Sequence, residues 1–194
     1  MWGVAGSSPE RMTIFITTIQ QKMEHLKFIR ETRQTVIDQM LEGVQIIPGS
    51  RVLEPSAGSG NLVQGILNKY PYLSLYCVEL NKELRDILKS KKFNVIGEDF
   101  FKLTPDPRYD FVIATPTYKD NVDVEHIMHM YNFIREGGTI ISLTYPAWTT
   151  HNSDRQRKFR YWLEDKNYSM KMLKDNSFVE NFDTQPSMII TITK

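Results

Sequence analysis

The chain has 194 residues, of which 41% are hydrophobic and 24% are charged, which is the balance of one folded domain and excludes a disordered chain. Lys and Arg number 24 against 23 Asp and Glu, so the net charge is +1. This net charge gives no indication of a nucleic acid or membrane partner, although a local basic patch could still bind nucleic acid. The single cysteine, Cys77, excludes an internal disulfide and a cysteine-based zinc cluster and is typical of a reducing cytoplasm.

Membrane and metal signals are weak along the whole sequence. No apolar run approaches the about 18 residues that a bilayer span needs, so we expect no membrane segment. The four histidines include one pair at i, i+3 spacing, His126 and His129. No Glu accompanies this pair in the arrangement of a zinc-protease helix, so we predict no metal site.

The first residues carry little structural signal. Residues 1–12 lack the basic and apolar segments of a secretory signal, and we expect a flexible tail or added residues there, with Met12 as a second candidate start. From residue 13 to 43, apolar side chains recur at intervals of three and four, which predicts N-terminal helices that end at Gly43. We expect residues 13–194 to form one domain, with these helices preceding an α/β core over 50–194.

From residue 50 onward, short apolar runs alternate with amphipathic segments. Strands are expected at 51–53, 74–79, 94–96, 110–114, 139–144, 168–173 and 187–193, and helices at 61–70, 82–90, 122–135 and 155–166. Strands separated by helices predict right-handed crossovers and a mostly parallel sheet with both faces covered. The last two strands have no helix between them, so they should pair antiparallel.

A turn with two glycines, Gly58 and Gly60, follows the first strand and precedes a helix, which allows a ligand to approach the backbone closely. Glu54 ends that strand, and the third glycine of a dinucleotide-binding turn is missing. Because a carboxylate there would repel a pyrophosphate and attract a cation, the pattern favours S-adenosylmethionine over a nicotinamide dinucleotide.

Two further carboxylates follow the next two strands. Glu79 is placed to accept hydrogen bonds from both ribose hydroxyls of an adenosine. Its alternative role is a helix cap, for which Asn81 is better placed. Asp99 is placed to accept from an adenine amino group while Phe100 covers the ring, and its alternative role is a solvated turn.

These residues carry a resemblance. Residues 52–60 read Val-Leu-Glu-Pro-Ser-Ala-Gly-Ser-Gly and closely resemble the cofactor motif of the class I S-adenosylmethionine-dependent methyltransferases, in particular its DNA adenine-N6 branch. The resemblance covers about residues 28–193 and implies a Rossmann-like seven-stranded sheet in the order 3-2-1-4-5-7-6 with the last strand antiparallel. It implies a helix over 35–42 near the methionine end of the cofactor. We expect the cofactor to contact Thr32, Glu54, Ser56, Ala57, Gly58, Gly60, Asn61, Leu62, Glu79, Leu80, Asp99, Phe100 and Thr115.

The loop after the fourth strand departs from this family. The family reads Asn-Pro-Pro-Tyr or Asp-Pro-Pro-Tyr there, whereas this chain reads Thr115-Pro116-Thr117-Tyr118. The resemblance implies that residue 115 and the Pro116 carbonyl accept the two hydrogens of the target amine, while Tyr118 stacks on a flipped base. A threonine hydroxyl is a shorter and less selective acceptor, and Thr117 loosens the loop. We therefore predict a weakened site.

A basic segment follows the fifth strand. Residues 151–174 contain seven Lys and Arg against three Asp and Glu, a local charge of +4. Basic residues interleaved with aromatic ones are typical of nucleic-acid surfaces, whereas Phe159 and Trp162 have the helical spacing of core residues. We expect DNA contacts from Trp148, Arg155, Arg157 and Lys158, and the alternative is that these charges only solvate a helix face.

The sequence thus predicts a cytoplasmic S-adenosylmethionine-dependent methyltransferase that modifies adenine N6 in DNA with weakened activity. Two alternatives stay open: a methyltransferase-like subunit that binds without catalysis, and an enzyme of the same fold that acts on RNA or on a protein glutamine. A dehydrogenase is disfavoured by Glu54 and the missing glycine. Because no segment is long enough for a separate recognition domain, we expect specificity to be slight or to come from a partner subunit.

Overall fold

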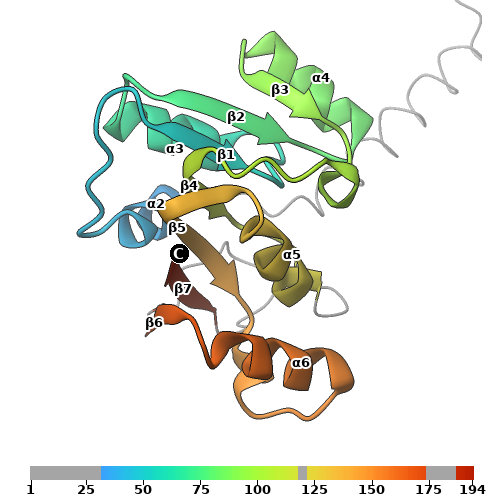
Figure 1. Ribbon diagram of the computed structural model, residues 1–194. Coiled ribbons are helices and arrows are strands. Elements are labelled where there is room, and N and C mark those ends of the chain that lie inside the picture. Colours follow the sequence, from blue (N-terminus) through green and yellow to red (C-terminus); the bar gives the residue numbers. More distant parts are fainter. Residues whose placement is uncertain (1–31, 118–121, 174–186) are drawn as a thin grey trace, which may run out of the picture. The chain divides into compact units, whose positions relative to one another are not determined.

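The computed structural model describes residues 32–117, 122–173 and 187–194 (Figure 1). The predicted tail and most of the predicted N-terminal helical region lie outside these residues. Among the described helices, none has the length and apolar character that crossing a membrane would require.

A sheet of seven strands organises the described part of the chain, in the order β3-β2-β1-β4-β5-β7-β6. The first five strands run parallel to one another, and β7 is antiparallel to both β5 and β6. The predicted strand order and the antiparallel last strand are therefore confirmed. The strands are β1 (Arg51–Glu54), β2 (Ser74–Val78), β3 (Asn94–Gly97), β4 (Tyr109–Ala114), β5 (Ile134–Thr144), β6 (Asn167–Met172) and β7 (Met188–Thr193).

Helices cover both faces of the sheet (Figure 1). They are α2 (Gln34–Met40), α3 (Asn61–Lys69), α4 (Lys82–Ser90), α5 (Val122–Met130) and α6 (Asp154–Leu163). One buried cluster joins α2 and α3 to the sheet and includes Ile37 and Ile66, and a second joins α5 and α6 to the opposite face and includes Ile127 and Phe159. Burial of these apolar faces supplies most of the stability of such a layered fold.

The segment after α5 differs from the prediction of one helix over 122–135. The helix ends at Met130, and β5 begins at Ile134. Ile134 pairs with Tyr109, and after a shift in register Thr139 pairs with Phe111. The glycines at 137 and 138 lie inside β5 at this irregularity, where Gly137 has a φ of 72°. The buried side chains before the two glycines fit the spacing of a helix as well as that of a strand. Their periodicity alone therefore does not distinguish a helix from a strand.

The carboxyl ends of β1 to β5 meet at one edge of the sheet because these strands are parallel. Ligands of open α/β sheets bind outside this edge. The residues predicted to bind the cofactor and the target amine leave the sheet there.

Candidate active site

Glu54 is the last residue of β1 and is fully buried, with a relative exposure of 0%. Its Oε1 accepts hydrogen bonds from the backbone N and the Oγ of Ser56, each at 3.2 Å. Its Oε2 is buried and has no hydrogen-bond partner among the described residues. Burial raises the pKa of Glu54 well above its ordinary value, and the bonds from Ser56 lower it in part. A buried acceptor of this kind fits a ligand that carries a cationic group.

The two glycines of the turn have different roles. Gly60 has a φ of 92°, and a Cβ there would lie 2.7 Å from Phe93 and 2.8 Å from Leu88, so close packing requires the glycine. Gly58 has a φ of 55°, and a Cβ there would meet nothing within 4 Å. Open space beside Gly58 leaves room for a ligand against the backbone.

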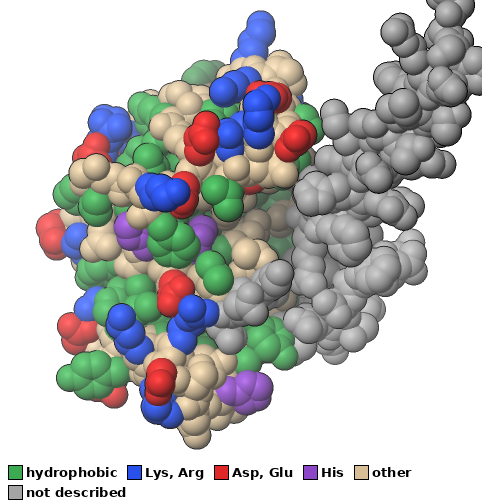
Figure 2. Space-filling model, turned by 90° about the vertical axis from the view of Figure 1, so that its right-hand side faces the viewer, with side chains coloured by type: hydrophobic (Ala, Val, Ile, Leu, Met, Phe, Trp, Pro, Cys, Tyr) green, Lys and Arg blue, Asp and Glu red, His purple; other side chains and the backbone are tan. Residues whose placement is uncertain are grey.

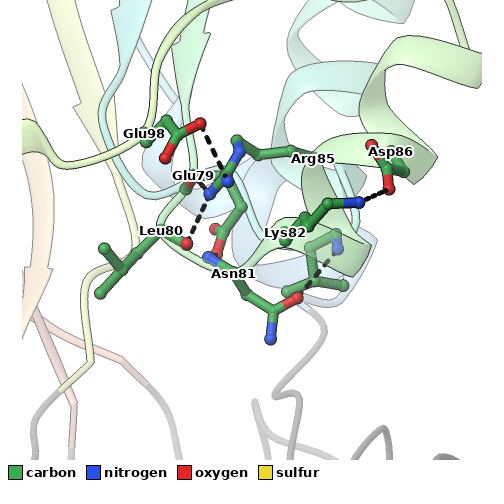
Figure 3. Close-up of polar contacts among 8 residues, drawn as sticks. Glu79, Leu80, Asn81, Lys82, Arg85, Asp86 and Glu98 are labelled. Atoms are coloured by element: carbon green, nitrogen blue, oxygen red, sulfur yellow. Dashed lines mark hydrogen bonds and ion pairs between the residues drawn. The ribbon is translucent and has the colours of Figure 1, made fainter.

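Glu79 directly follows β2 and connects this turn to the next helix. Its Oε2 accepts from the backbone N of Gly58 at 2.7 Å, and its Oε1 accepts from the backbone N of Asn81 at 2.8 Å. Asn81 caps α4 by accepting from Leu84 N, so the alternative role as a cap belongs to Asn81 and not to Glu79 (Figure 3). Each carboxylate oxygen retains capacity for another donor, such as a ribose hydroxyl.

The other residues of the turn are partly structural. Ala57 donates its backbone N–H to Val78 O at 2.9 Å, and Leu62 is a core residue with 3% exposure. Asn61 begins α3 and accepts from the Ser59 hydroxyl at 3.3 Å. Leu80 is 72% exposed, so an apolar side chain stands free beside Glu79.

The structure buries Phe100, the residue that is predicted to cover the adenine. Phe100 is 3% exposed, and its ring lies 5.0 Å from that of Phe133 and 4.7 Å from that of His129. It is therefore a core residue, whereas its neighbour Phe101 is 45% exposed. Asp99 Oδ1 accepts from Phe101 N at 3.1 Å and starts a short 3-10 helix, as in the predicted alternative of a turn.

The histidine pair packs on the same aromatic rings. The ring of His126 lies 4.6 Å from Phe101 and 5.4 Å from Phe100. Burial lowers the pKa of His126 to about 4, and burial also lowers the pKa of His129. Both rings are therefore neutral at pH 7. The described residues hold no cluster of three or more His, Cys, Asp or Glu that could bind a metal ion.

The loop that is predicted to hold the target amine begins at the end of β4. The Thr115 hydroxyl lies within hydrogen-bond distance, 2.9 Å, of the hydroxyl of Thr32, which is 9% exposed and precedes α2. Pro116 is buried and Thr117 is exposed. Tyr118 lies outside the described residues. The structure thus brings Thr32 and Thr115 together at the carboxyl edge, as expected if both belong to one site.

Sequence reasoning missed Asp123, which is 1% exposed. Its Oδ2 accepts from the Thr144 hydroxyl at 2.6 Å and from Tyr145 N at 2.9 Å, while Oδ1 has no partner in the described part of the chain. Burial raises the pKa of Asp123. The carboxyl ties the start of α5 to the end of β5. The signal available in the sequence was an acidic residue between apolar residues at the start of a predicted helix.

The residues predicted to contact nucleic acid differ in how far they are buried and in which side chains they contact. Trp148, a predicted DNA contact, is 4% exposed and packs edge-on against Phe159 with ring centres 4.9 Å apart. The expected core role of Phe159 is confirmed by its 0% exposure. Arg155 pairs with Glu125 at 2.8 Å.

The other two residues predicted to contact nucleic acid are Arg157 and Lys158 in α6. Arg157 pairs with Asp154, and Lys158 is exposed with no ion-pair partner among the described residues. On the face shown in Figure 2, Lys and Arg side chains lie among Asp and Glu rather than in one continuous basic patch. Local carboxylates therefore compensate much of the positive charge that the sequence shows.

Three known proteins with sequence similarity are methyltransferases by name, although no protein-family model matches the chain. The modification methylase CviBIII of Paramecium bursaria Chlorella virus NC1A is 30% identical over 113 residues, covering 55% of this chain and 30% of that protein. The malonyl-(acyl-carrier protein) O-methyltransferase 2 of Ilyobacter polytropus is 28% identical over 48% of this chain and 39% of that protein. The ribosomal RNA small subunit methyltransferase A of Pseudomonas syringae pv. tomato is 33% identical over 49% and 38%. The chain spans less than two fifths of the length of these relatives.

Solved structures share the fold at low sequence identity. Precorrin-6y C5,15-methyltransferase from Geobacter metallireducens superposes with a TM-score of 0.59 and 20% identity, over 84% of this chain and 90% of that chain. A modification subunit assigned to a type I restriction enzyme of Vibrio vulnificus gives 0.66 and 12%, over 98% and 51%. The plantazolicin methyltransferase BpumL, in complex with S-adenosylhomocysteine, gives 0.56 and 10%, over 96% and 91%. With the strand order and the site at the carboxyl edge, these likenesses establish that the chain has the class I fold of the S-adenosylmethionine-dependent methyltransferases.

Proposed function

We propose that this chain is an S-adenosylmethionine-dependent methyltransferase that modifies adenine N6 in DNA with a weakened catalytic loop. The observation that carries the cofactor assignment is the pair of buried carboxylates at adjacent strand ends. Oε2 of Glu54 is buried and has no hydrogen-bond partner within the described part of the chain, and Glu79 is oriented by the backbone N–H of Gly58. One acceptor for a cationic group and one for a ribose match the two ends of the cofactor.

The residues present fit this cofactor. Glu54 would accept from its ammonium group, Glu79 from its ribose hydroxyls, and Leu80 would lie against the adenine. When bound, S-adenosylmethionine supplies an electrophilic methyl group. The chain's own task is to hold the target amine, which the Pro116 carbonyl and the Thr115 hydroxyl would do by accepting its two hydrogens. Alignment contributes more than a strong base for such an amine.

DNA is the proposed substrate for two reasons. The Glu-Pro-Ser-Ala-Gly motif is similar to that of the adenine-N6 branch, and one relative is by name a modification methylase. The structural likeness to a modification subunit supports a role beside a partner subunit that supplies specificity. The relative named for ribosomal RNA favours RNA as the second candidate substrate.

A binding subunit without catalysis is the second candidate function. The contact between Thr115 and Thr32 favours it, because a hydroxyl engaged with another hydroxyl is less available to a target amine. Cofactor binding is expected in both cases, so methyl transfer has to be measured directly.

The test is transfer of a tritiated methyl group to duplex DNA, single-stranded DNA and structured RNA in single-turnover reactions. The products are digested to nucleosides and separated. The proposal expects slow labelling of N6-methyladenine in DNA. Labelling of RNA alone would replace the substrate, and cofactor binding without labelling of any nucleic acid would favour the binding subunit.

A further inference from the structure

Arg85 is a buried cation in α4, with 8% exposure. Its Nη1 donates to Glu79 O at 2.9 Å and to Leu80 O at 2.5 Å, and its Nη2 forms an ion pair with Glu98 Oε1 at 3.1 Å (Figure 3). The guanidinium therefore points back from the helix into the turn that precedes it. A buried arginine needs such partners, because leaving its charge uncompensated would be strongly unfavourable.

The two carbonyls that Arg85 binds belong to the turn that carries the ribose-binding candidate. Glu79 presents its carboxylate to Gly58 N and Asn81 N, while its own backbone carbonyl is held by Arg85. The residue is thus fixed at both its side chain and its backbone. Without the guanidinium, the carbonyls of Glu79 and Leu80 would lose a charged donor, and the turn could shift.

Glu98 extends this connection to the neighbouring strand. It directly follows β3 and precedes Asp99. The pairing of β2 and β3 is irregular at this end, because the register shifts between Cys77 and Val78. Arg85 therefore bridges two strand ends where the backbone ladder is disturbed. Glu79, directly after β2, and Asp99, directly after Glu98, are the candidates for contact with the adenosine.

We propose that Arg85 is a positioning residue for the adenosine end of the cofactor. It acts through the Glu79-Leu80 turn and through Glu98, and it does not touch the ligand. The inference rests on the proposed cofactor site and adds a residue that the motif does not contain. Its loss should weaken adenosine-containing ligands by moving Glu79, even in protein that remains folded.

The test compares Arg85→Met with Lys82→Met, a control in the same helix whose cation is exposed and pairs with Asp86 at 3.0 Å. Calorimetric affinities are measured for S-adenosylhomocysteine and for adenosine, well below the unfolding temperature of each variant. We expect Arg85→Met to weaken both ligands by about tenfold, the loss of one charged hydrogen bond. Lys82→Met should leave both affinities unchanged.

A double-mutant cycle with Glu79→Ala separates positioning from a general structural role. If Arg85 acts through Glu79, the double variant should bind S-adenosylhomocysteine about as weakly as Glu79→Ala alone. Arg85→Lys, which retains the charge without the forked donor, should fall between wild type and Arg85→Met. It also serves as the test variant if Arg85→Met does not fold.

The outcomes distinguish this inference from the proposed function. If wild type binds S-adenosylhomocysteine but Arg85→Met and Arg85→Lys bind it equally well, the positioning role is wrong and the cofactor site stands. Fully additive effects of Arg85→Met and Glu79→Ala would also overturn the inference. If wild type does not bind S-adenosylhomocysteine, the proposed cofactor site fails, and the positioning role fails with it.

Discussion

The hydroxyl of Thr32 lies 2.9 Å from the hydroxyl of Thr115, which joins the segment before α2 to the first residue after β4. Residue 115 is where the resembling family has an asparagine or an aspartate that accepts from the target amine. A threonine hydroxyl can donate or accept, and here it is already engaged by a second hydroxyl. The contact thus gives a structural reason for the weakened site that the sequence predicts.

Restoring the family residues in this loop should raise the rate of methyl transfer. Thr115→Asn with Thr117→Pro supplies a longer acceptor and a stiffer backbone. Loss of one preorganised polar group at a reacting centre costs about 10²–10³ in rate, so a gain of up to that size is expected in single-turnover reactions. Affinity for S-adenosylmethionine is the control and should change little. Robust turnover by the unmodified chain would contradict the weakened-site account.

Asp123 ties the start of α5 to the end of β5, and its removal should destabilise the folded protein. Asp123→Ala leaves the Thr144 hydroxyl and Tyr145 N without their acceptor. Each buried donor left unsatisfied costs about 1–3 kcal/mol in the free energy of unfolding, which urea titration measures. Thr149→Val, at an exposed hydroxyl that donates to Pro146 O, is the matched control. Equal stability of the two variants would show that Asp123 is not an anchor.

Glu54 should make the unliganded protein less stable as the pH rises. Burial raises its pKa in the folded state, whereas the unfolded residue titrates near about 4.3. Between these two pKa values the folded state binds more protons, so the free energy of unfolding falls as the pH increases. Glu54→Gln should reduce this fall, and the exposed Glu83→Gln should not.

Urea titrations across this pH range measure the effect. Asp123 contributes a dependence of the same sign, because burial raises its pKa too. Some slope should therefore remain in Glu54→Gln. A pH dependence identical in wild type and Glu54→Gln would contradict a buried, proton-binding Glu54.

Lys158 is the best remaining candidate for a phosphate contact in α6. Arg155 and Arg157 pair with carboxylates, whereas Lys158 has no such partner in the described residues. Lys158→Met should therefore reduce the slope of log affinity against log salt for duplex DNA by about one contact. Arg155→Met should change the slope less. Fluorescence anisotropy measures both slopes. An unchanged slope in Lys158→Met would show that Lys158 makes no phosphate contact.

The parallel sheet and the edge at which the site is expected follow from local patterns, whereas the strand order was implied by the resemblance to the methyltransferases. Alternating strands and helices determine a parallel sheet, and the ends of parallel strands bring Glu54, Glu79 and Thr115 to one edge. The motif around Gly58 identified the first of these ends. No distant contact was needed for either inference.

The remaining features depend on tertiary contacts. Two adjacent phenylalanines gave no indication that Phe100 is buried and Phe101 exposed. Trp148 precedes a basic segment in the sequence, but it packs on Phe159 in space. Arg85 reads as an ordinary charged residue of an amphipathic helix, and only the folded chain shows that it reaches Glu79 and Leu80.

Calorimetric titration with S-adenosylmethionine of wild type, Glu79→Ala and the exposed control Glu83→Ala tests the central claim most directly. Glu79→Ala removes the acceptor of two ribose hydrogen bonds, each worth about 1.5–3 kcal/mol because the acceptor is charged. The account predicts that wild type and Glu83→Ala bind equally and that Glu79→Ala binds at least about tenfold more weakly. Equal affinity of wild type and Glu79→Ala would contradict the cofactor site at the carboxyl edge of the sheet.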